Sequence, residues 1–249
     1  MLGLQIWIST VFRVARQFLT STCDLLRLVG TKAYFYPRKH AGLTSRIVFD
    51  LKFWRRFVSS EPEAKLQNVL GRLPENSAIL ASDASTSWGM AGTVIFSKRK
   101  AAFRGFEGLF WQIAWSDRER IVAIESLKPA QLVEINAAEF LAALITCETF
   151  TELCSGKITT IEIDNTSAKS WFDSARCPVF PFDRCAQGEH LYFLKCNMKL
   201  RTSWISSSDN KFADIFSRER FPMDKKGCLV YGTRMLRVRP KWRRVIRYL

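Results

Sequence analysis

The stretch Ala78-Ile79-Leu80-Ala81-Ser82-Asp83-Ala84 decides the fold class, because it places one aspartate inside an otherwise apolar run. The polar turn Ser85-Thr86-Ser87 separates it from a second apolar run, residues 89–96, and the two runs predict neighbouring strands. A charge inside an apolar strand is costly unless something balances it, so Asp83 is a candidate functional residue. The alternative is a strand-end aspartate that makes an Asx turn into Ser85.

Downstream of these strands the hydrophobic period changes repeatedly. Residues 101–106 can pair as a third strand, and residues 108–133 show no clean period, which indicates a long insertion. The remaining pattern predicts, in order, a helix over 136–150, a strand over 157–163, helices over 166–175 and 190–197, a strand over 199–205 and a helix over 211–220. This order predicts an α/β fold with a mixed sheet flanked by helices.

Residues upstream of the first strand have a different pattern. Apolar side chains recur at three- and four-residue steps in 4–28 and 47–58, which predicts helices, and a break follows around Pro74. We therefore expect three parts: a small helical segment over 1–75, an α/β domain over 76–220 and a basic tail over 221–249.

Charge separates the same three parts. Residues 1–75 carry 12 basic and 5 acidic side chains, residues 76–220 carry 17 of each, and residues 221–249 carry 9 and 1. The net charge of +15 therefore lies in the flanks and indicates a polyanionic partner such as nucleic acid. The tail mixes basic and aromatic residues, as phosphate and base contacts require, and its candidate contacts are Arg237, Arg239, Lys241, Trp242, Arg243 and Arg244. The alternative is a solvated tail that attracts any polyanion without selectivity.

Cysteine and histidine usage favours a reducing, intracellular setting in the cytoplasm or nucleus. The seven cysteines form no CxxC pair and only two histidines accompany them, so we expect neither a zinc site nor a disulfide framework. Of the two histidines, His190 is expected to be an ordinary helix residue. The first dozen residues are apolar but lack a basic start and run into Arg13, which favours an amphipathic or core helix over a secretion signal or membrane span.

Three further carboxylates stand at the ends of predicted elements. Glu139 lies at the start of the first long helix, Asp164 ends the strand over 157–163, and Asp214 lies on the last helix. Each has a simpler interpretation: Glu139 can form a capping box with Asn136, Asp164 can cap the next helix, and Asp214 can be solvated. Parallel central strands would instead bring all three to Asp83 at one end of the sheet. Four oxygen ligands suit Mg²⁺ or Mn²⁺, so we predict a site for two such ions.

These segments resemble, in family order, the motifs of reverse-transcriptase ribonuclease H (RNase H) domains, most of all those of tyrosine-recombinase (DIRS-like) retrotransposons. The similar segments are Ser82-Asp83-Ala84-Ser85 with Trp88-Gly89-Met90-Ala91-Gly92, Ile135-Asn136-Ala137-Ala138-Glu139-Phe140-Leu141-Ala142, Asp164-Asn165-Thr166-Ser167-Ala168, and Ala213-Asp214-Ile215-Phe216-Ser217-Arg218. The resemblance implies an RNase H-like fold with Asp83, Glu139, Asp164 and Asp214 as catalytic metal ligands. It also implies contacts to nucleic acid from Ser85, Asn165, Thr166 and Arg218.

Upstream, the resemblance is to the connection segment that precedes such domains, carried in part by Asp50-Leu51-Lys52-Phe53-Trp54. The polymerase palm with its paired aspartates has no counterpart, so we expect no polymerase activity, and the remainder of a reverse transcriptase is a candidate partner. The family's His-Ile-Pro-Gly loop is replaced by Trp204-Ile205-Ser206-Ser207, which loses the histidine and the Pro-Gly turn.

The resemblance implies a metal-dependent endonuclease that hydrolyses the RNA strand of RNA–DNA hybrids. The alternative is a non-catalytic nucleic-acid-binding or scaffold module that derives from a retroelement. A third reading keeps the chemistry but acts on DNA; the DNT-like and ADxLSR-like segments at Asp164 and Asp214 argue against it.

Overall fold

The structure is a computed structural model, and it describes residues 47–48, 50–52, 54–55, 78–96, 105–116, 135–174, 176–179, 182–196, 198–222 and 226–242. The chain divides into two compact units, Met1–Gly71 and Arg72–Leu249, close to the boundary expected near residue 75. In the first unit the described residues, all between 47 and 55, are helical. The candidate site lies in the second unit.

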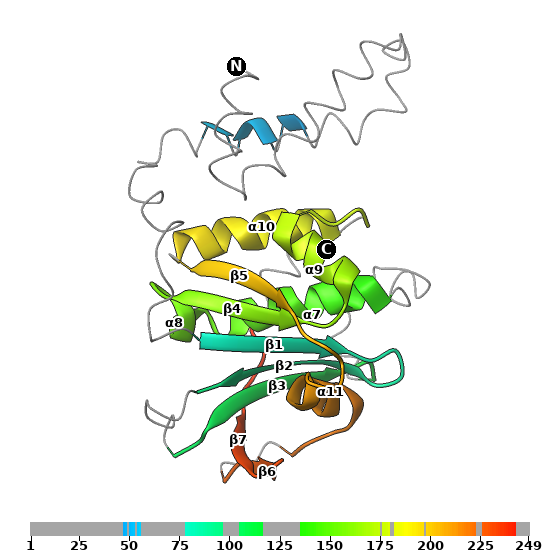
Figure 1. Cartoon of the computed structure of the whole chain (residues 1–249). Helices are drawn as coiled ribbons and strands as arrows, with labels where there is room; N and C mark the ends of the chain where they lie inside the picture. The colour runs from blue at the N-terminus through cyan, green and yellow to red at the C-terminus, as the bar shows by residue number, and fades with distance from the viewer. Residues whose placement is uncertain are drawn as a thin grey trace. The chain divides into compact units, whose positions relative to one another are not determined.

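The second unit is an α/β domain built on a seven-stranded mixed sheet (Figure 1). Its strands are β1 (Ala78–Ala84), β2 (Gly89–Ile95), β3 (Gly108–Ala114), β4 (Ile158–Ile163), β5 (Lys199–Trp204), β6 (Cys228–Val230) and β7 (Thr233–Arg237). They lie in the order β5-β4-β1-β2-β3-β7-β6. The pairs β1–β2, β2–β3 and β6–β7 are antiparallel, whereas β1–β4, β4–β5 and β3–β7 are parallel.

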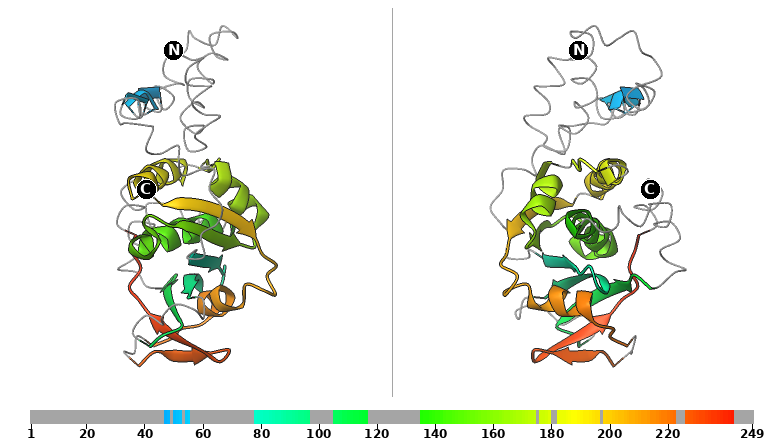
Figure 2. Two further views of the ribbon diagram at one scale, coloured as in Figure 1. Left: turned by 60° about the vertical axis from the view of Figure 1, so that its left-hand side comes forward. Right: turned by 90° about the vertical axis from the view of Figure 1, so that its right-hand side faces the viewer.

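Five helices accompany the sheet in the described part of this unit: α7 (Ile135–Thr149), α8 (Thr151–Cys154), α9 (Thr166–Ser174), α10 (Phe182–Lys195) and α11 (Lys211–Arg218). α7 packs against β1, β2 and β4, while α11 packs against β1, β2 and β3. The two helices lie on opposite sides of the sheet, with α9 and α10 on the side of α7 (Figure 2). The expected α/β class, with a mixed sheet flanked by helices, is confirmed.

Two apolar cores explain this layering. The larger core lies between the sheet and α7 and includes Trp111 of β3, whereas the smaller core joins Phe110 of β3 to Phe216 of α11. Phe110 and Phe216 stack with ring centroids 3.8 Å apart. Because successive strand residues point to opposite faces, β3 supplies side chains to both cores and is buried throughout.

Close packing of α7 on the sheet depends on a glycine in β2. A Cβ at Gly92 would lie 1.9 Å from Oγ1 of Thr146 in α7, which is far inside contact distance. The indole N–H of Trp111 donates to that same hydroxyl over 3.2 Å. Gly92 therefore allows the helix and the strand to approach each other.

The third strand is not where the sequence pattern placed it. The strand expected over 101–106 is wrong for its described residues, since Gly105 and Phe106 form a turn and an isolated bridge, and β3 begins at Gly108. The start of the expected insertion over 108–133 is thus a central strand, and residues 117–133 lie outside the described residues. Burial on both faces removed the polar–apolar alternation by which the strand would have been recognised.

The C-terminal segment also differs from the expected tail over 221–249. Residues 228–237 form β6 and β7, and β7 pairs with β3, so this part of the segment belongs to the sheet. The hairpin turn places Tyr231 and Gly232 at positive φ. Among the helices of the described residues, none combines the length and the apolar character that a membrane span requires.

Candidate metal centre

Three carboxylates from three elements meet at one end of the sheet. Asp83 lies near the end of β1, Glu139 lies in the first turns of α7, and Asp164 directly follows β4. One carboxylate oxygen of each lies within 4.8 Å of the others, a spacing at which a single ion can be shared. They converge because β1 and β4 are parallel neighbours whose carboxyl ends meet at the same edge.

Asp83 is buried, with 3% of its surface exposed. The Ser217 hydroxyl, on α11, donates to Oδ2 of Asp83, so the aspartate side chain points to the face of the sheet that α11 covers. Burial raises the pKa of Asp83 to about 7; the Ser217 hydrogen bond opposes the shift, and the charges of Asp164 and Asp214 add to it. An Asx turn would leave the carboxylate at the chain turn, so the hydrogen bond to α11 argues against that alternative.

Glu139 is also buried, at 4% exposure, and faces the same point. Burial and then the charges of Asp83 and Asp164 raise its pKa to about 9, while a hydrogen bond from the backbone N–H of Ala84 lowers it. Its Oε2 atom has no hydrogen-bond partner among the described residues. A glutamate in a capping box would reach back to its own helix start, whereas Glu139 reaches across to β1.

Asp164 does not cap α9, because its neighbour does. The side-chain oxygen of Asn165 accepts the backbone N–H of Ala168, three residues on, which is the N-cap hydrogen bond, and Asn165 Nδ2 donates to Asn136 Oδ1 over 2.9 Å. The second bond ties the loop after β4 to the first turn of α7. Asn165 thereby holds Asp164 and Glu139 side by side and leaves the Asp164 carboxylate available.

Asp214 lies beside the three carboxylates but is not one of the group within 4.8 Å. Its Oδ1 accepts Nε of Arg218 at 2.7 Å and pairs with Nη2 at 2.6 Å, one helical turn along α11. The negative charge of Asp214 nevertheless contributes to the raised pKa of Asp83, and the Arg218 charge opposes that shift. Of the four carboxylates expected to converge, the structure brings three together and pairs the fourth with an arginine.

Three residues that support the site were missed by the sequence analysis: Ser217, Gln112 and Asn210. Gln112 of β3 donates to the carbonyls of Phe216 and Glu219, and its side-chain oxygen accepts the N–H of Phe221, so it fixes the end of α11. Asn210 donates to the Ser82 carbonyl over 3.0 Å and so fixes the start of the same helix against β1. A polar side chain inside an apolar strand, as at Gln112, is the one signal by which such a role could have been suspected.

The residues expected to contact nucleic acid differ in their exposure and in the contacts they already make. Thr166, Arg218 and Arg239 are exposed, whereas Ser85 is buried and its carbonyl accepts the indole N–H of Trp115. In the C-terminal segment, Arg237 donates to the Phe221 carbonyl, Lys241 pairs with Glu152 at 2.6 Å, and Trp242 packs against the larger core. Arg243 and Arg244 lie outside the described residues.

His190 has the structural role expected of it. Its Nδ1 lies 2.8 Å from the Ala186 carbonyl, and its ring packs between those of Phe172 and Phe193. Burial lowers its pKa. It therefore stabilises the packing of α9 against α10 and takes no part in the carboxylate cluster.

The donor set of the cluster fits a hard divalent cation. Its three donors are carboxylate oxygens, and two of the three residues, Asp83 and Glu139, are buried. A bound cation would balance like charges placed so close together. The unpartnered Oε2 of Glu139 is a buried acceptor of the kind that an ion would satisfy. Asp83, Glu139 and Asp164 could thus hold a metal ion.

Comparison with known proteins assigns no function to these residues. No protein-family model matches the chain, and no curated protein is significantly similar to it.

Proposed function

We propose that the second unit is an RNase H-like domain that hydrolyses the RNA strand of RNA–DNA hybrids with Mg²⁺ or Mn²⁺. The observation that carries this proposal is the meeting of Asp83, Glu139 and Asp164 within 4.8 Å at the end of parallel strands. In the sheet order β5-β4-β1-β2-β3, β1 is parallel to β4 on one side and antiparallel to β2 on the other. This order is compatible with the RNase H-like fold that the sequence motifs imply.

The roles of the residues follow from their positions. Asp83, Glu139 and Asp164 would hold the ion, Ser217 orients Asp83, and Asn165 keeps Glu139 beside Asp164. A bound Mg²⁺ or Mn²⁺ supplies a Lewis acid that stabilises negative charge developing on the phosphate oxygens. Asp214 as a ligand stays a prediction, since it would have to exchange Arg218 for the ion. The guanidinium of Arg218, 61% exposed, is then free to pair with a backbone phosphate of the substrate.

Substrate choice is tested by comparing three labelled duplexes. The full chain is incubated with an RNA–DNA hybrid, a double-stranded RNA and a double-stranded DNA of one sequence, in Mg²⁺, in Mn²⁺ and in EDTA. We expect the RNA strand to be cut in the hybrid only, and only with metal. Cleavage of the DNA duplex would indicate a DNA nuclease in place of an RNase H. Binding without cleavage of any duplex would support the non-catalytic module instead.

A further inference from the structure

Trp204 is a large aromatic side chain that the structure leaves exposed at the edge of the carboxylate cluster. It ends β5, and 55% of its surface is accessible. Trp204 is the register partner of Ile163 on β4, the residue directly before Asp164. The position of Trp204 distinguishes it from other exposed apolar residues, because it lies beside a candidate metal ligand.

The indole ring is held in place from one side. Its Nε1 donates to the backbone carbonyl of Asp164 over 2.9 Å, so one edge of the ring is fixed to the residue whose carboxylate joins the cluster. The hydrogen bond uses the polar atom of the indole and leaves the apolar ring for another contact. Trp204 is therefore oriented before any ligand arrives.

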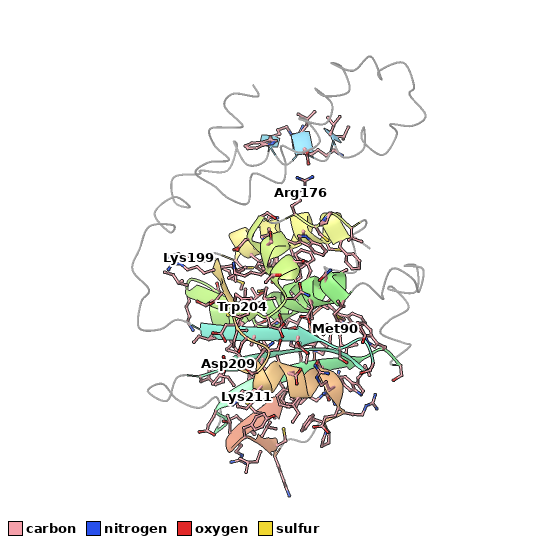
Figure 3. All side chains as sticks on the ribbon, turned by 45° about the vertical axis from the view of Figure 1, so that its right-hand side comes forward. Met90, Arg176, Lys199, Trp204, Asp209 and Lys211 are labelled. Atoms are coloured by element: carbon pink, nitrogen blue, oxygen red, sulfur yellow. The ribbon has the colours of Figure 1, made fainter. Side chains whose placement is uncertain are left out.

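The loop after Trp204 is also fixed. The backbone N–H groups of Asp209 and Asn210 both donate to the Ser206 carbonyl, and the Ser206 hydroxyl donates to the Asp209 carboxylate over 2.6 Å. Asn210 then anchors the loop to β1 at Ser82. Figure 3 shows Trp204, Asp209 and Lys211 following one another from the end of β5 to the start of α11.

We propose that Trp204 is a stacking platform for a nucleobase of the strand bound at the carboxylate cluster. This inference rests on the proposed function, because it takes the ligand to be a nucleic acid. Inside a duplex both faces of a base are covered by its neighbours, so the base on Trp204 is an unpaired one, at an end of the hybrid or in a single-stranded extension. Such a base offers a flat π-face whatever its identity, so stacking on a rigid indole adds affinity without sequence selectivity. Trp204 would thereby fix the register of the strand relative to Asp83, Glu139 and Asp164.

The test combines a protein change with a substrate change. Binding of a labelled RNA–DNA hybrid with a single-stranded extension on each strand is measured by anisotropy, with Ca²⁺ in place of Mg²⁺ and strand lengths checked after each titration. We expect Trp204→Ala to weaken binding roughly 5- to 150-fold, as the loss of one stacked base predicts, and Trp204→Phe to retain most of the affinity. Ile79→Ala is the control, since Ile79 is an exposed apolar residue, 46%, at the start of β1 and so at the opposite end of that strand from Asp83.

Hybrids with one abasic site, moved along each strand in turn, locate the stacked base. At one position the wild-type chain should lose affinity and Trp204→Ala should lose nothing more, because the missing base and the missing ring remove the same contact. An unchanged affinity of Trp204→Ala, or an equal loss in Ile79→Ala, would overturn the inference. So would an equal penalty at every abasic position.

Failure of this inference differs from failure of the proposed function. If the wild-type chain cuts the hybrid but Trp204→Ala binds normally, only the stacking role falls. If the wild-type chain binds through Trp204 but cuts nothing, the stacking role is supported and the proposed nuclease activity is refuted. A wild-type chain that binds no nucleic acid overturns both.

Discussion

Asp83 and Glu139 are two buried acids whose protons a bound metal ion would displace. Burial raises the pKa of Asp83 to about 7 and that of Glu139 to about 9, whereas both would titrate near 4 in an unfolded chain. Between about pH 4 and pH 9 the folded state therefore binds more protons than the unfolded state. Its stability must fall as pH rises through this window, because the protons that neutralise the cluster are lost.

The decrease of stability with rising pH gives the first prediction. In EDTA the melting temperature of the α/β domain should decrease from pH 5 to pH 9. Mn²⁺ should raise it, and by more at pH 9 than at pH 5, since the ion binds the deprotonated carboxylates. Scanning calorimetry at matched ionic strength measures both. A Mn²⁺ effect that is equal at the two pH values, or absent at both, would argue against a metal centre at these residues.

Ser217 gives the second prediction. Its hydroxyl donates to Asp83 and also lies 2.8 Å from the Asp214 carbonyl, so Ser217→Ala removes the one side-chain hydrogen bond to Asp83 that the described residues provide. We expect Mn²⁺ affinity at pH 7 to fall roughly 10- to 100-fold, as is usual when the partner of a metal ligand is lost. Calorimetric titration measures it. Ser174→Ala is the control, because within the described part of the chain the Ser174 hydroxyl bonds only to backbone carbonyls in and just beyond α9. An equal loss there would assign the effect to general destabilisation.

At the scale of the element, α11 depends on Gln112 for its position. Gln112 makes three hydrogen bonds to the end of the helix and the residues after it, and it is fully buried. We expect Gln112→Leu to lower the free energy of unfolding by about 2–4 kcal/mol in urea denaturation, because buried backbone groups lose their partners. It should also weaken Mn²⁺ binding, since α11 carries Ser217.

Thr93 of β2 provides the contrasting control for that prediction. Its hydroxyl is buried and has no hydrogen-bond partner among the described residues. Thr93→Val keeps the shape and removes the polar atom, so it should be neutral or stabilising. If Gln112→Leu proved equally harmless, the hydrogen bonds of Gln112 would not be what holds α11.

The sequence pattern predicts most, but not all, of the observed helices and strands. The pattern predicts β1, β2, β4, β5, α7, α9 and α11 nearly at their observed bounds, because each has a regular period or a capping residue at its start. It recovers only the second half of α10, which begins at Phe182 and not at residue 190. It misses β3, which is buried on both faces, and the short strands β6 and β7 near one edge of the sheet, which lie in a segment rich in basic residues.

The site was predictable in part for a similar reason. Asp83, Glu139 and Asp164 stand at the ends of regular elements, so their convergence follows from parallel strands. The pairing of Asp214 with Arg218 lies within α11 and follows from their four-residue spacing on a helix. The hydrogen bond from Ser217 to Asp83 depends on how α11 packs across the sheet. No periodicity in the sequence encodes that packing, so this contact could not be predicted.

The C-terminal segment contains the strands β6 and β7 and, after them, residues 243–249, which truncation can remove alone. Removing residues 225–249 would remove β6 and β7 and uncover β3, so we expect that truncation to destabilise the domain. Removing residues 243–249 deletes Arg243, Arg244 and Arg247 and keeps both strands. If these arginines contact phosphates, the slope of log affinity for the hybrid against log salt should decrease by up to about 2–3. An unchanged slope, measured by anisotropy, would show that they make no such contacts.

Asp164→Asn tests whether Asp83, Glu139 and Asp164 hold an ion that is needed to cleave the RNA strand. The substitution keeps the shape of the side chain and removes one negative charge from the cluster, while Asn165 still caps α9. Asp209→Asn is the matched control, because Asp209 is exposed on the loop before α11 and bonds to Ser206. We predict that Asp164→Asn stays folded and binds the hybrid, yet loses Mg²⁺-dependent cleavage by several orders of magnitude, while Asp209→Asn cleaves at nearly the wild-type rate. Cleavage by Asp164→Asn at the wild-type rate would show that Asp164 holds no ion needed for cleavage.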